Sequence, residues 1–177
     1  MPSMTADKQS QAGQTVSPEE VREVMRHWAT GVAIVSSAHD GDRHGMTVSS
    51  FISLALSPPL VLVSLEQISR THDLVTRAGA FGVSILASDQ ADISNRFAGR
   101  ETEESDRFAG LETRTLSTGC PLLTAALALF DCKLNASYPA GTHTMMIGEV
   151  VVADVQRDAN HTQPLLYFNR NYRNIEK

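Results

Sequence analysis

Positive charge is scarce in this chain. Its 15 lysine and arginine residues stand against 20 aspartate and glutamate residues, so the formal net charge is −5 at pH 7. A nucleic-acid-binding surface normally needs a clear excess of basic side chains. The balance of charge therefore argues against a DNA- or RNA-binding protein.

Long hydrophobic runs are also missing. No apolar stretch approaches the roughly 20 residues that a membrane helix needs, and no membrane association is expected. Residues 1–16 are polar and lack the hydrophobic stretch of a secretory signal. We expect a disordered N-terminal tail over 1–16, one folded domain over 17–177, and a cytoplasmic protein.

Cysteine is rare, with Cys120 and Cys132 as the two examples. Their spacing matches no metal-ligand motif, and in the absence of an export signal we expect reduced thiols. The chain also lacks G-x-G-x-x-G, G-x-x-x-x-G-K-[ST] and G-x-S-x-G motifs. These absences exclude the usual dinucleotide and phosphate loops and the nucleophile elbow of hydrolases.

Histidines offer a weak alternative. His39 and His44 flank Asp40 and Asp42 in one predicted turn, where they could form an incidental surface metal site. A solvated hairpin tip explains the same residues, and we favour that interpretation. No metal site is expected.

What the chain does have is enough apolar sequence for a core, since 42% of its 177 residues are hydrophobic. Ser17, Pro18 and Glu20 are typical of a helix start with a capping box. The helix is expected to end near Thr30–Gly31. Its apolar face would consist of Val21, Val24, Met25 and Trp28.

Strands are expected to outnumber helices, and they do not alternate regularly with them, so a doubly wound parallel sheet is disfavoured. A closed or half-closed antiparallel barrel with peripheral helices fits better. Residues 100–110 are expected to form a solvated connector. The expected strands are 32–37, 46–54, 60–65, 80–86, 125–135, 143–155 and 164–170. Two further helices are expected over 71–79 and 88–99. A turn is expected over 38–45, and Pro58–Pro59 should interrupt the strand structure.

A polar cluster, Ser69-Arg70-Thr71, stands before one expected helix. Hydroxyls, a guanidinium and free helix N–H groups could form a phosphate cradle, but Ser and Thr in this position are also common caps. A second choice concerns Thr47, Ser49 and Ser50, which could meet a ligand or be satisfied within the protein. Both alternatives stay open at this point, as does a ligand-facing or exposed position for His143.

Several segments together resemble the short-chain flavin reductases, the small partners of two-component flavin-dependent monooxygenases. The resemblance covers about residues 20 to 175. It is carried by seven segments in the same order: "HWATGVAIVSS", "GMTVSSFISLALSPPLVLVSL", "SRTHDLVTRAGAFGVSIL", "DQADISNRFAG", "STGCPLLTAALALFDCKL", "GTHTMMIGEV" and "PLLYFNRNY".

The resemblance implies a mainly β, FMN-binding split β-barrel of Greek-key antiparallel type, working as a homodimer with flavin near the subunit interface. It implies hydride transfer from NADH or NADPH to FMN or FAD, with reduced flavin supplied to a separate monooxygenase component.

The resemblance also assigns roles to residues. Ser49 stands where the family often has asparagine, and Thr142 stands where it often has an aspartate before the histidine. His143, helped by Tyr172, would be the nicotinamide-side catalytic residue. Gly45, Met46, Thr47, Val48, Ser49 and Ser50 would lie along the flavin ring and ribityl chain, Ser64 and Leu65 beside the ring, Ser69, Arg70 and Thr71 at the phosphate, and Thr30 and Phe97 at the border of the site.

A non-enzymatic split barrel that carries or senses flavin or haem is the alternative function; it would bind its ligand without nicotinamide turnover. A third possibility is an interaction subunit whose barrel only dimerises, which would leave the clustered hydroxyls poorly explained.

Overall fold

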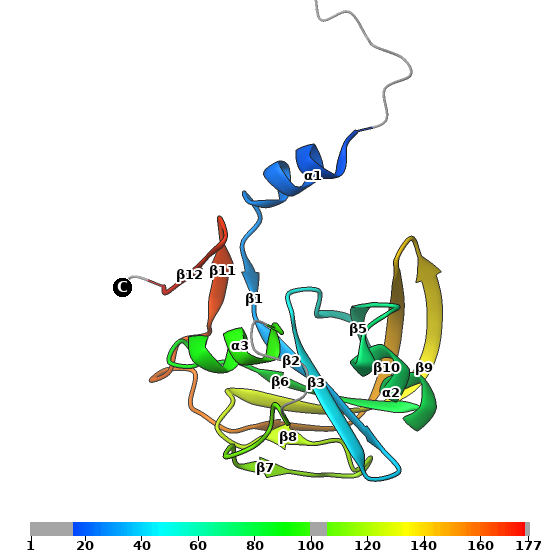
Figure 1. The fold of residues 1–177 in the computed structure, drawn as a ribbon. Coiled ribbons are helices and arrows are strands. Elements are labelled where there is room, and N and C mark those ends of the chain that lie inside the picture. Colours follow the sequence, from blue (N-terminus) through cyan, green and yellow to red (C-terminus); the bar gives the residue numbers. More distant parts are fainter. Residues whose placement is uncertain (1–15, 100–105, 176–177) are drawn as a thin grey trace, which may run out of the picture.

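A computed structural model describes residues 16–99 and 106–175. Strands dominate it, as Figure 1 shows, and every strand pair is antiparallel. The expectation of a mainly β antiparallel fold is confirmed. The tail expected over 1–16 lies outside the described residues except for Val16, as does the part of the expected connector before Asp106.

The elements fall into three helices and twelve strands within the described residues. The helices are α1 (Pro18–Met25), α2 (Arg70–Ala78) and α3 (Ala91–Phe97). The strands are β1 (Thr30–Gly31), β2 (Ala33–His39), β3 (Asp42–Val48), β4 (Ile52–Leu56), β5 (Pro59–Glu66), β6 (Ala80–Ile85), β7 (Thr113–Arg114), β8 (Leu122–Leu123), β9 (Ala128–Ala140), β10 (His143–Val155), β11 (Leu166–Phe168) and β12 (Asn171–Arg173).

Seven strands form the main sheet, in the order β3-β2-β6-β9-β10-β5-β4. The two end strands of this order, β3 and β4, are neighbours in the chain, and only residues 49–51 separate them. The sheet therefore curls until its two edges approach each other. Two small sheets, β1-β11-β12 and β7-β8, complete the β-structure.

The gap between the two edges corrects one expectation. Residues 46–54 were expected to form a single strand, but the chain leaves the sheet at Ser49 and returns at Ile52. Ser50 ties this segment to β5: its hydroxyl donates to the carbonyl of Ser64 and accepts that residue's N–H, both at 3.0 Å. We call the opening at residues 49–51 the split.

Two apolar clusters hold the sheet in shape. The first fills the inside of the curled sheet, with Val35, Val63, Phe81 and Met146 almost fully buried. The second lies between the sheet, α3 and the segment around Phe108, and it includes the fully buried Phe97. Burial of this kind contributes about 1.5–3 kcal/mol per large side chain.

Local signals for the helices are mostly met. Gly79 ends α2 in the left-handed conformation, at φ 63°, as expected. The capping box of Ser17 and Glu20 forms, but α1 ends at Met25, and Thr30–Gly31 is a strand. Helix α3 begins at Ala91, after Gln90, so Asp89 precedes its first turn.

Helix α1 differs from the expectation in a second way. Its apolar residues share one side, yet none of its residues is buried, and Val24 remains 71% exposed. Figure 1 shows α1 standing away from the sheet at the N-terminal end. No helix within residues 16–99 or 106–175 is both long and apolar enough to cross a bilayer.

Candidate active site

Two hollows meet at the ends of β3 and β5, close to the split. The larger, here called the deep cavity, has a volume of about 620 Å³, and the smaller, the groove, about 280 Å³. They share Met46, Thr47 and Glu66. The deep cavity is lined by these three and by His44, Gln67, Ile68, Ser69, Arg70, Thr71, Asp73, Phe97, Ala98, Gly99 and Arg107; the groove by the three and by Val48, Ser49, Ser50, Ser64 and His143.

The start of α2 forms one wall of the deep cavity. Ser69 is the N-cap: its hydroxyl accepts the N–H of His72 at 3.2 Å and donates to the carbonyl of Glu66 at 2.7 Å. The side chain of Ser69 therefore caps the helix, which is one of the two alternatives that the sequence left open. The first N–H groups of a helix have no intrahelical partner, and their partial positive charge favours an anion here.

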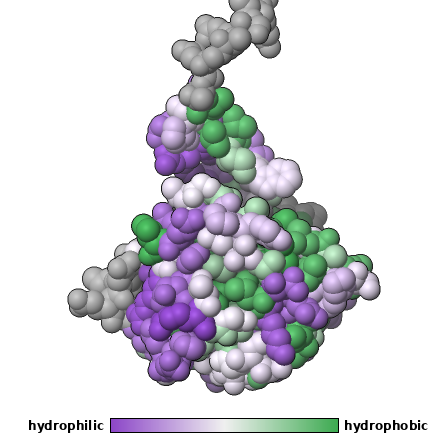
Figure 2. Space-filling view, turned by 90° about the vertical axis from the view of Figure 1, so that its right-hand side faces the viewer, coloured by the Kyte–Doolittle hydropathy of each residue, from purple (hydrophilic) through white to green (hydrophobic). Residues whose placement is uncertain are grey.

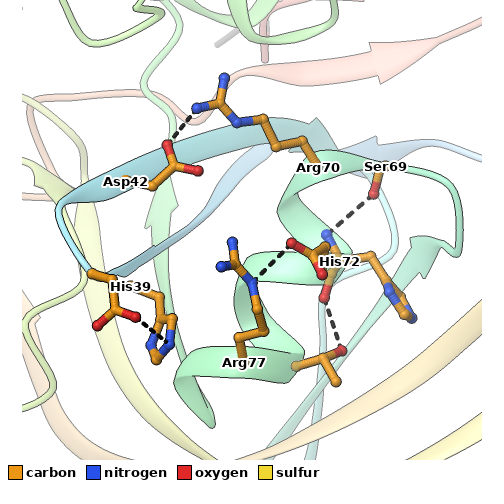
Figure 3. A network of polar contacts seen from close by, with 9 residues as sticks. His39, Asp42, Ser69, Arg70, His72 and Arg77 are labelled. Carbon is orange, nitrogen blue, oxygen red and sulfur yellow. Dashed lines mark hydrogen bonds and ion pairs between the residues drawn. The ribbon is translucent and has the colours of Figure 1, made fainter.

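Arg70, the first residue of α2, brings a guanidinium to the same wall. It is half exposed, and its Nη2 pairs with the carboxylate of Asp42, the first residue of β3, as Figure 3 shows. This pair keeps the pKa of Asp42 below its usual value. Asp42 is not among the residues that line the deep cavity.

His44 and Thr71 form the floor. Both are buried, and the Nδ1 atom of His44 lies 2.8 Å from the hydroxyl of Thr71. Burial, together with the positive charges of Arg107 and Arg70, lowers the pKa of His44 to about 4. His44 is therefore neutral at neutral pH, and the charged side chains that line the cavity are Arg70, Arg107, Glu66 and Asp73.

Arg107 closes the far side. Its Nη1 atom donates to the carbonyls of Gly45 and Phe97, each at 3.0 Å, and the side chain is buried. Gly99 leaves room for it, because a Cβ there would lie 3.1 Å from Nη2. The expected solvated connector over 100–110 is thus wrong at Arg107 and Phe108, both of which are buried.

The groove ends at His143, the first residue of β10. His143 lies opposite Glu66 of β5 in the strand register, and its carbonyl accepts the side-chain N–H of Gln67 at 3.0 Å. Its ring is exposed, and Nδ1 lies 3.0 Å from the hydroxyl of Thr142. Thr142 therefore supplies the histidine with a polar contact where the resemblance leads one to expect a carboxylate.

Taken together, the site can hold an elongated ligand with an anionic end. Helix N–H groups, Arg70 and Arg107 favour a phosphate in or beside the deep cavity. The groove has a partly apolar wall and polar backbone edges, which suit a planar heterocycle. Among the described residues, no three histidine, cysteine or acidic side chains gather as a metal ion would require.

Comparison with known proteins decides which family this is. Residues 25–176 match the flavin reductase like domain family. The chain belongs to that family.

Family relatives match over most of their length. An NADH-dependent flavin reductase from Pseudomonas fluorescens is 38% identical over 152 residues, covering 85% of this chain and 86% of that protein. The reductase component of 4-hydroxyphenylacetate 3-monooxygenase from Thermus thermophilus is 33% identical over 157 residues, covering 89% and 96%.

Solved flavin reductases share the fold. The NADH:FAD oxidoreductase of Streptomyces globisporus superposes with a TM-score of 0.83 at 28% identity, covering 94% of this chain and 99% of that one. The flavin reductase of styrene monooxygenase from Pseudomonas putida S12 gives 0.78 at 34% identity, covering 89% and 97%. The expected split β-barrel is confirmed.

In this chain, the fold brings most of the expected site residues together. Eleven of the fifteen line the deep cavity or the groove: Met46, Thr47, Val48, Ser49, Ser50, Ser64, Ser69, Arg70, Thr71, Phe97 and His143. Several of their hydroxyls are already bonded within the protein. Thr47 donates to the carbonyl of Ser94 at 2.7 Å, for example.

Four expected residues lie off these two hollows. Leu65 is fully buried in the inner core, and Gly45 lies behind the cavity wall, where a Cβ would come within 2.9 Å of the Phe97 ring. Tyr172 donates to the hydroxyl of Ser94 and the side-chain oxygen of Asn95, at 2.9 and 3.0 Å, beside a separate hollow. Thr30 lines further hollows next to Trp28.

Sequence reasoning missed His44, Glu66 and Arg107 as lining residues. His44 was attributed to a hairpin tip, but the turn is confined to Asp40–Gly41 and β3 carries His44 inside. Glu66 could have been found, since it directly follows the expected strand 60–65. Arg107 carried no local signal, because its burial depends on carbonyls from β3 and α3.

Proposed function

We propose that this protein is an NAD(P)H-dependent flavin reductase that transfers hydride from a nicotinamide to FMN or FAD and supplies reduced flavin to a separate monooxygenase. The observation that carries the proposal is the continuity of the two hollows. A cavity with two arginines and a helix N-terminus, which suit a phosphate, leads at Met46, Thr47 and Glu66 into a groove that ends at His143. Relatives in the family are named for this activity.

The residues present fit a flavin. Arg70 and the N–H groups at the start of α2 would hold the phosphate, with Arg107 adding positive charge from the far wall. Thr47 through Ser50 would border the ribityl chain and ring, mainly through backbone groups, because the Thr47 and Ser50 hydroxyls bond within the protein. Ser64 would border the ring from β5.

The protein's own work is chiefly positional. A bound flavin supplies the atom that accepts the hydride. The groove would hold the nicotinamide ring against it at reacting distance, which converts a bimolecular step into a local one. His143, oriented by the hydroxyl of Thr142, would contact the nicotinamide side and fix its pose.

A direct test follows NADH or NADPH consumption by absorbance with catalytic FMN or FAD, in all four combinations. Flavin-dependent oxidation well above the rate without protein is expected. Measurable flavin binding without turnover would instead support the carrier or sensor alternative. Absence of any flavin binding would leave a haem-binding barrel or the interaction subunit.

We also propose that two copies of the chain form a homodimer of single domains, residues 17–177 in each. Support comes from apolar side chains left uncovered at two places. Edge strand β4 exposes Ile52, Leu54 and Leu56, the last at 89%, and α1 exposes its whole apolar side. Figure 2 shows apolar surface on one side of α1 and over part of the body. A second copy would cover both.

The proposed location is the cytoplasm, where a nicotinamide-dependent reductase meets its donor. The two free cysteines, both buried, are compatible with a reducing compartment. Cell fractionation with an antibody to the native protein would test this, and recovery in an exported fraction would contradict it.

A further inference from the structure

The arginine best placed for the flavin phosphate already has an anionic partner. Arg70 pairs with Asp42, and the two residues begin neighbouring elements, α2 and β3, as Figure 3 shows. Both side chains are partly exposed, at 51% and 38%. The contact is therefore of the exposed kind, weak enough to open and close without disturbing the fold.

The carboxylate that engages Arg70 is not part of the cavity lining. Arg70 lines the deep cavity and Asp42 does not, so the ion pair ties a cavity guanidinium to a residue outside the lining. Because the Arg70 contact lowers the pKa of Asp42, this carboxylate is negatively charged throughout the neutral pH range. A phosphate in the cavity would meet a guanidinium that is already engaged, with a negative charge just behind it.

We propose that Asp42 competes with the flavin phosphate for Arg70 and so sets how tightly flavin is held. The inference rests on the proposed function, in which Arg70 binds that phosphate. A guanidinium presents one planar fork of donors, and a bidentate contact with phosphate uses the donors that a carboxylate would take. The Asp42 charge also repels a phosphate dianion at short range. Asp42 thus favours release of the flavin, which a reductase serving a separate oxygenase requires.

Asp42→Asn removes the charge and keeps the shape of the side chain. The dissociation constant for oxidised FMN, measured by calorimetry or flavin fluorescence, is expected to fall about two- to fivefold, the range given by exposed ion pairs. Riboflavin has the same ring and no phosphate, so its dissociation constant should not change. A slower FMN off-rate in stopped flow should accompany the tighter binding.

A matched control removes the same kind of pair elsewhere. The Nη1 atom of Arg157 donates to both carboxylate oxygens of Asp89, each at 3.0 Å, and neither residue lines the cavity or the groove. Asp89→Asn changes the net charge equally and should leave FMN binding as in the parent protein. An equal gain in this variant would attribute the effect to overall charge and overturn the proposal.

Arg70→Ala separates the two levels of the inference. If Arg70 binds the phosphate, this variant loses affinity for FMN and keeps its affinity for riboflavin. Adding Asp42→Asn to it brings a smaller gain than in the parent protein, because only the direct repulsion is relieved. If Arg70→Ala leaves FMN binding unchanged, the phosphate assignment fails and the competition fails with it. If Arg70→Ala weakens FMN but Asp42→Asn leaves it unchanged or weakens it too, the assignment stands and the competition alone is overturned.

Discussion

At the scale of single residues, the floor of the cavity depends on a histidine that resists protonation. His44 is neutral because burial, Arg107 and Arg70 all disfavour its charged form, with only Asp42 favouring it. Its neutral ring can accept the Thr71 hydroxyl proton or donate to that oxygen at 2.8 Å. The same neutrality links this residue to the pH dependence of stability.

His44→Asn tests that link. A histidine in the unfolded chain takes up a proton near pH 6.5, while folded His44 does so near pH 4. The unfolded state therefore binds more protons between these values, and this residue's contribution to stability falls as the pH falls from about 6.5 to 4. The slope is at most about 1.4 kcal/mol per pH unit.

Urea unfolding at a series of pH values measures the effect. In the asparagine variant, which retains a hydrogen-bonding group for Thr71, the free energy of unfolding should decline less steeply over this interval. Parallel curves for the two proteins would show that His44 does not titrate there.

A second residue-scale prediction concerns Thr142, whose hydroxyl contacts the ring of His143. Thr142→Val removes the hydroxyl at nearly constant size and is expected to lower kcat/KM for the nicotinamide about two- to tenfold, the range for loss of one hydrogen bond. Flavin binding should be unchanged. Thr142→Asp, which keeps an acceptor beside the ring, should restore the activity; a loss equal to that of the valine variant would contradict the orienting role.

At the scale of elements, the start of α2 shows which role the Ser69 side chain has, because the sequence allowed either a helix cap or a phosphate cradle. The side chain caps the helix, so Ser69→Ala should lower the free energy of unfolding by about 0.5–2 kcal/mol. Ser69→Asp preserves the cap and adds a negative charge at the proposed phosphate site. It should retain near-parental stability in chemical denaturation while raising the dissociation constant for FMN.

The two Ser69 variants distinguish a purely structural helix cap from a phosphate-binding helix start. If Ser69→Asp binds FMN as well as the parent protein does, the helix start is a structural cap and no phosphate approaches it. Riboflavin again serves as the ligand without phosphate, and its binding should be the same in both variants.

Elements were predictable where their signals are local. The capping box at Ser17, the helix expected over 71–79 and the strand expected over 125–135 depend on neighbouring residues, and each marks a real element. The strand expected over 46–54 was wrong because at residues 49–51 the chain passes from β3 to the opposite edge of the sheet, where Ser50 bonds to Ser64 of β5. Long-range contacts of this kind leave no local pattern.

The site divides in the same way. Residues 46–50 and 69–71 were predictable as a group because the resemblance covers contiguous segments. Arg107 and His44 were not, since their burial arises from packing among β3, α2 and α3. Gly45 and Leu65 were expected at the ligand, yet they lie in the supporting layer behind it, where side-chain direction and packing, rather than chain order, decide what faces the cavity.

At the scale of the whole molecule, the uncovered apolar surface is the unexplained feature of a single chain. Strand β4 ends the main sheet, pairs only with β5, and presents backbone groups and apolar side chains outward. Such an edge favours pairing with another chain unless something covers it. Trp28, which follows α1 and is 66% exposed, adds apolar surface that a partner would have to cover. A second copy of this chain would satisfy both surfaces at once.

Charge placed on that edge should separate the copies. Ile52→Glu combined with Leu56→Glu is expected to shift the mass measured by light scattering after gel filtration from dimer to monomer, because two carboxylates cannot be buried unpaired in an apolar interface. Val155→Glu is the matched control: Val155 is 73% exposed and lies beyond the part of β10 that pairs with β5. Circular dichroism should show that all variants keep their strand content. A parent protein that elutes as a monomer would overturn the dimer, and a dimer that survives both glutamates would move the interface away from β4 toward α1.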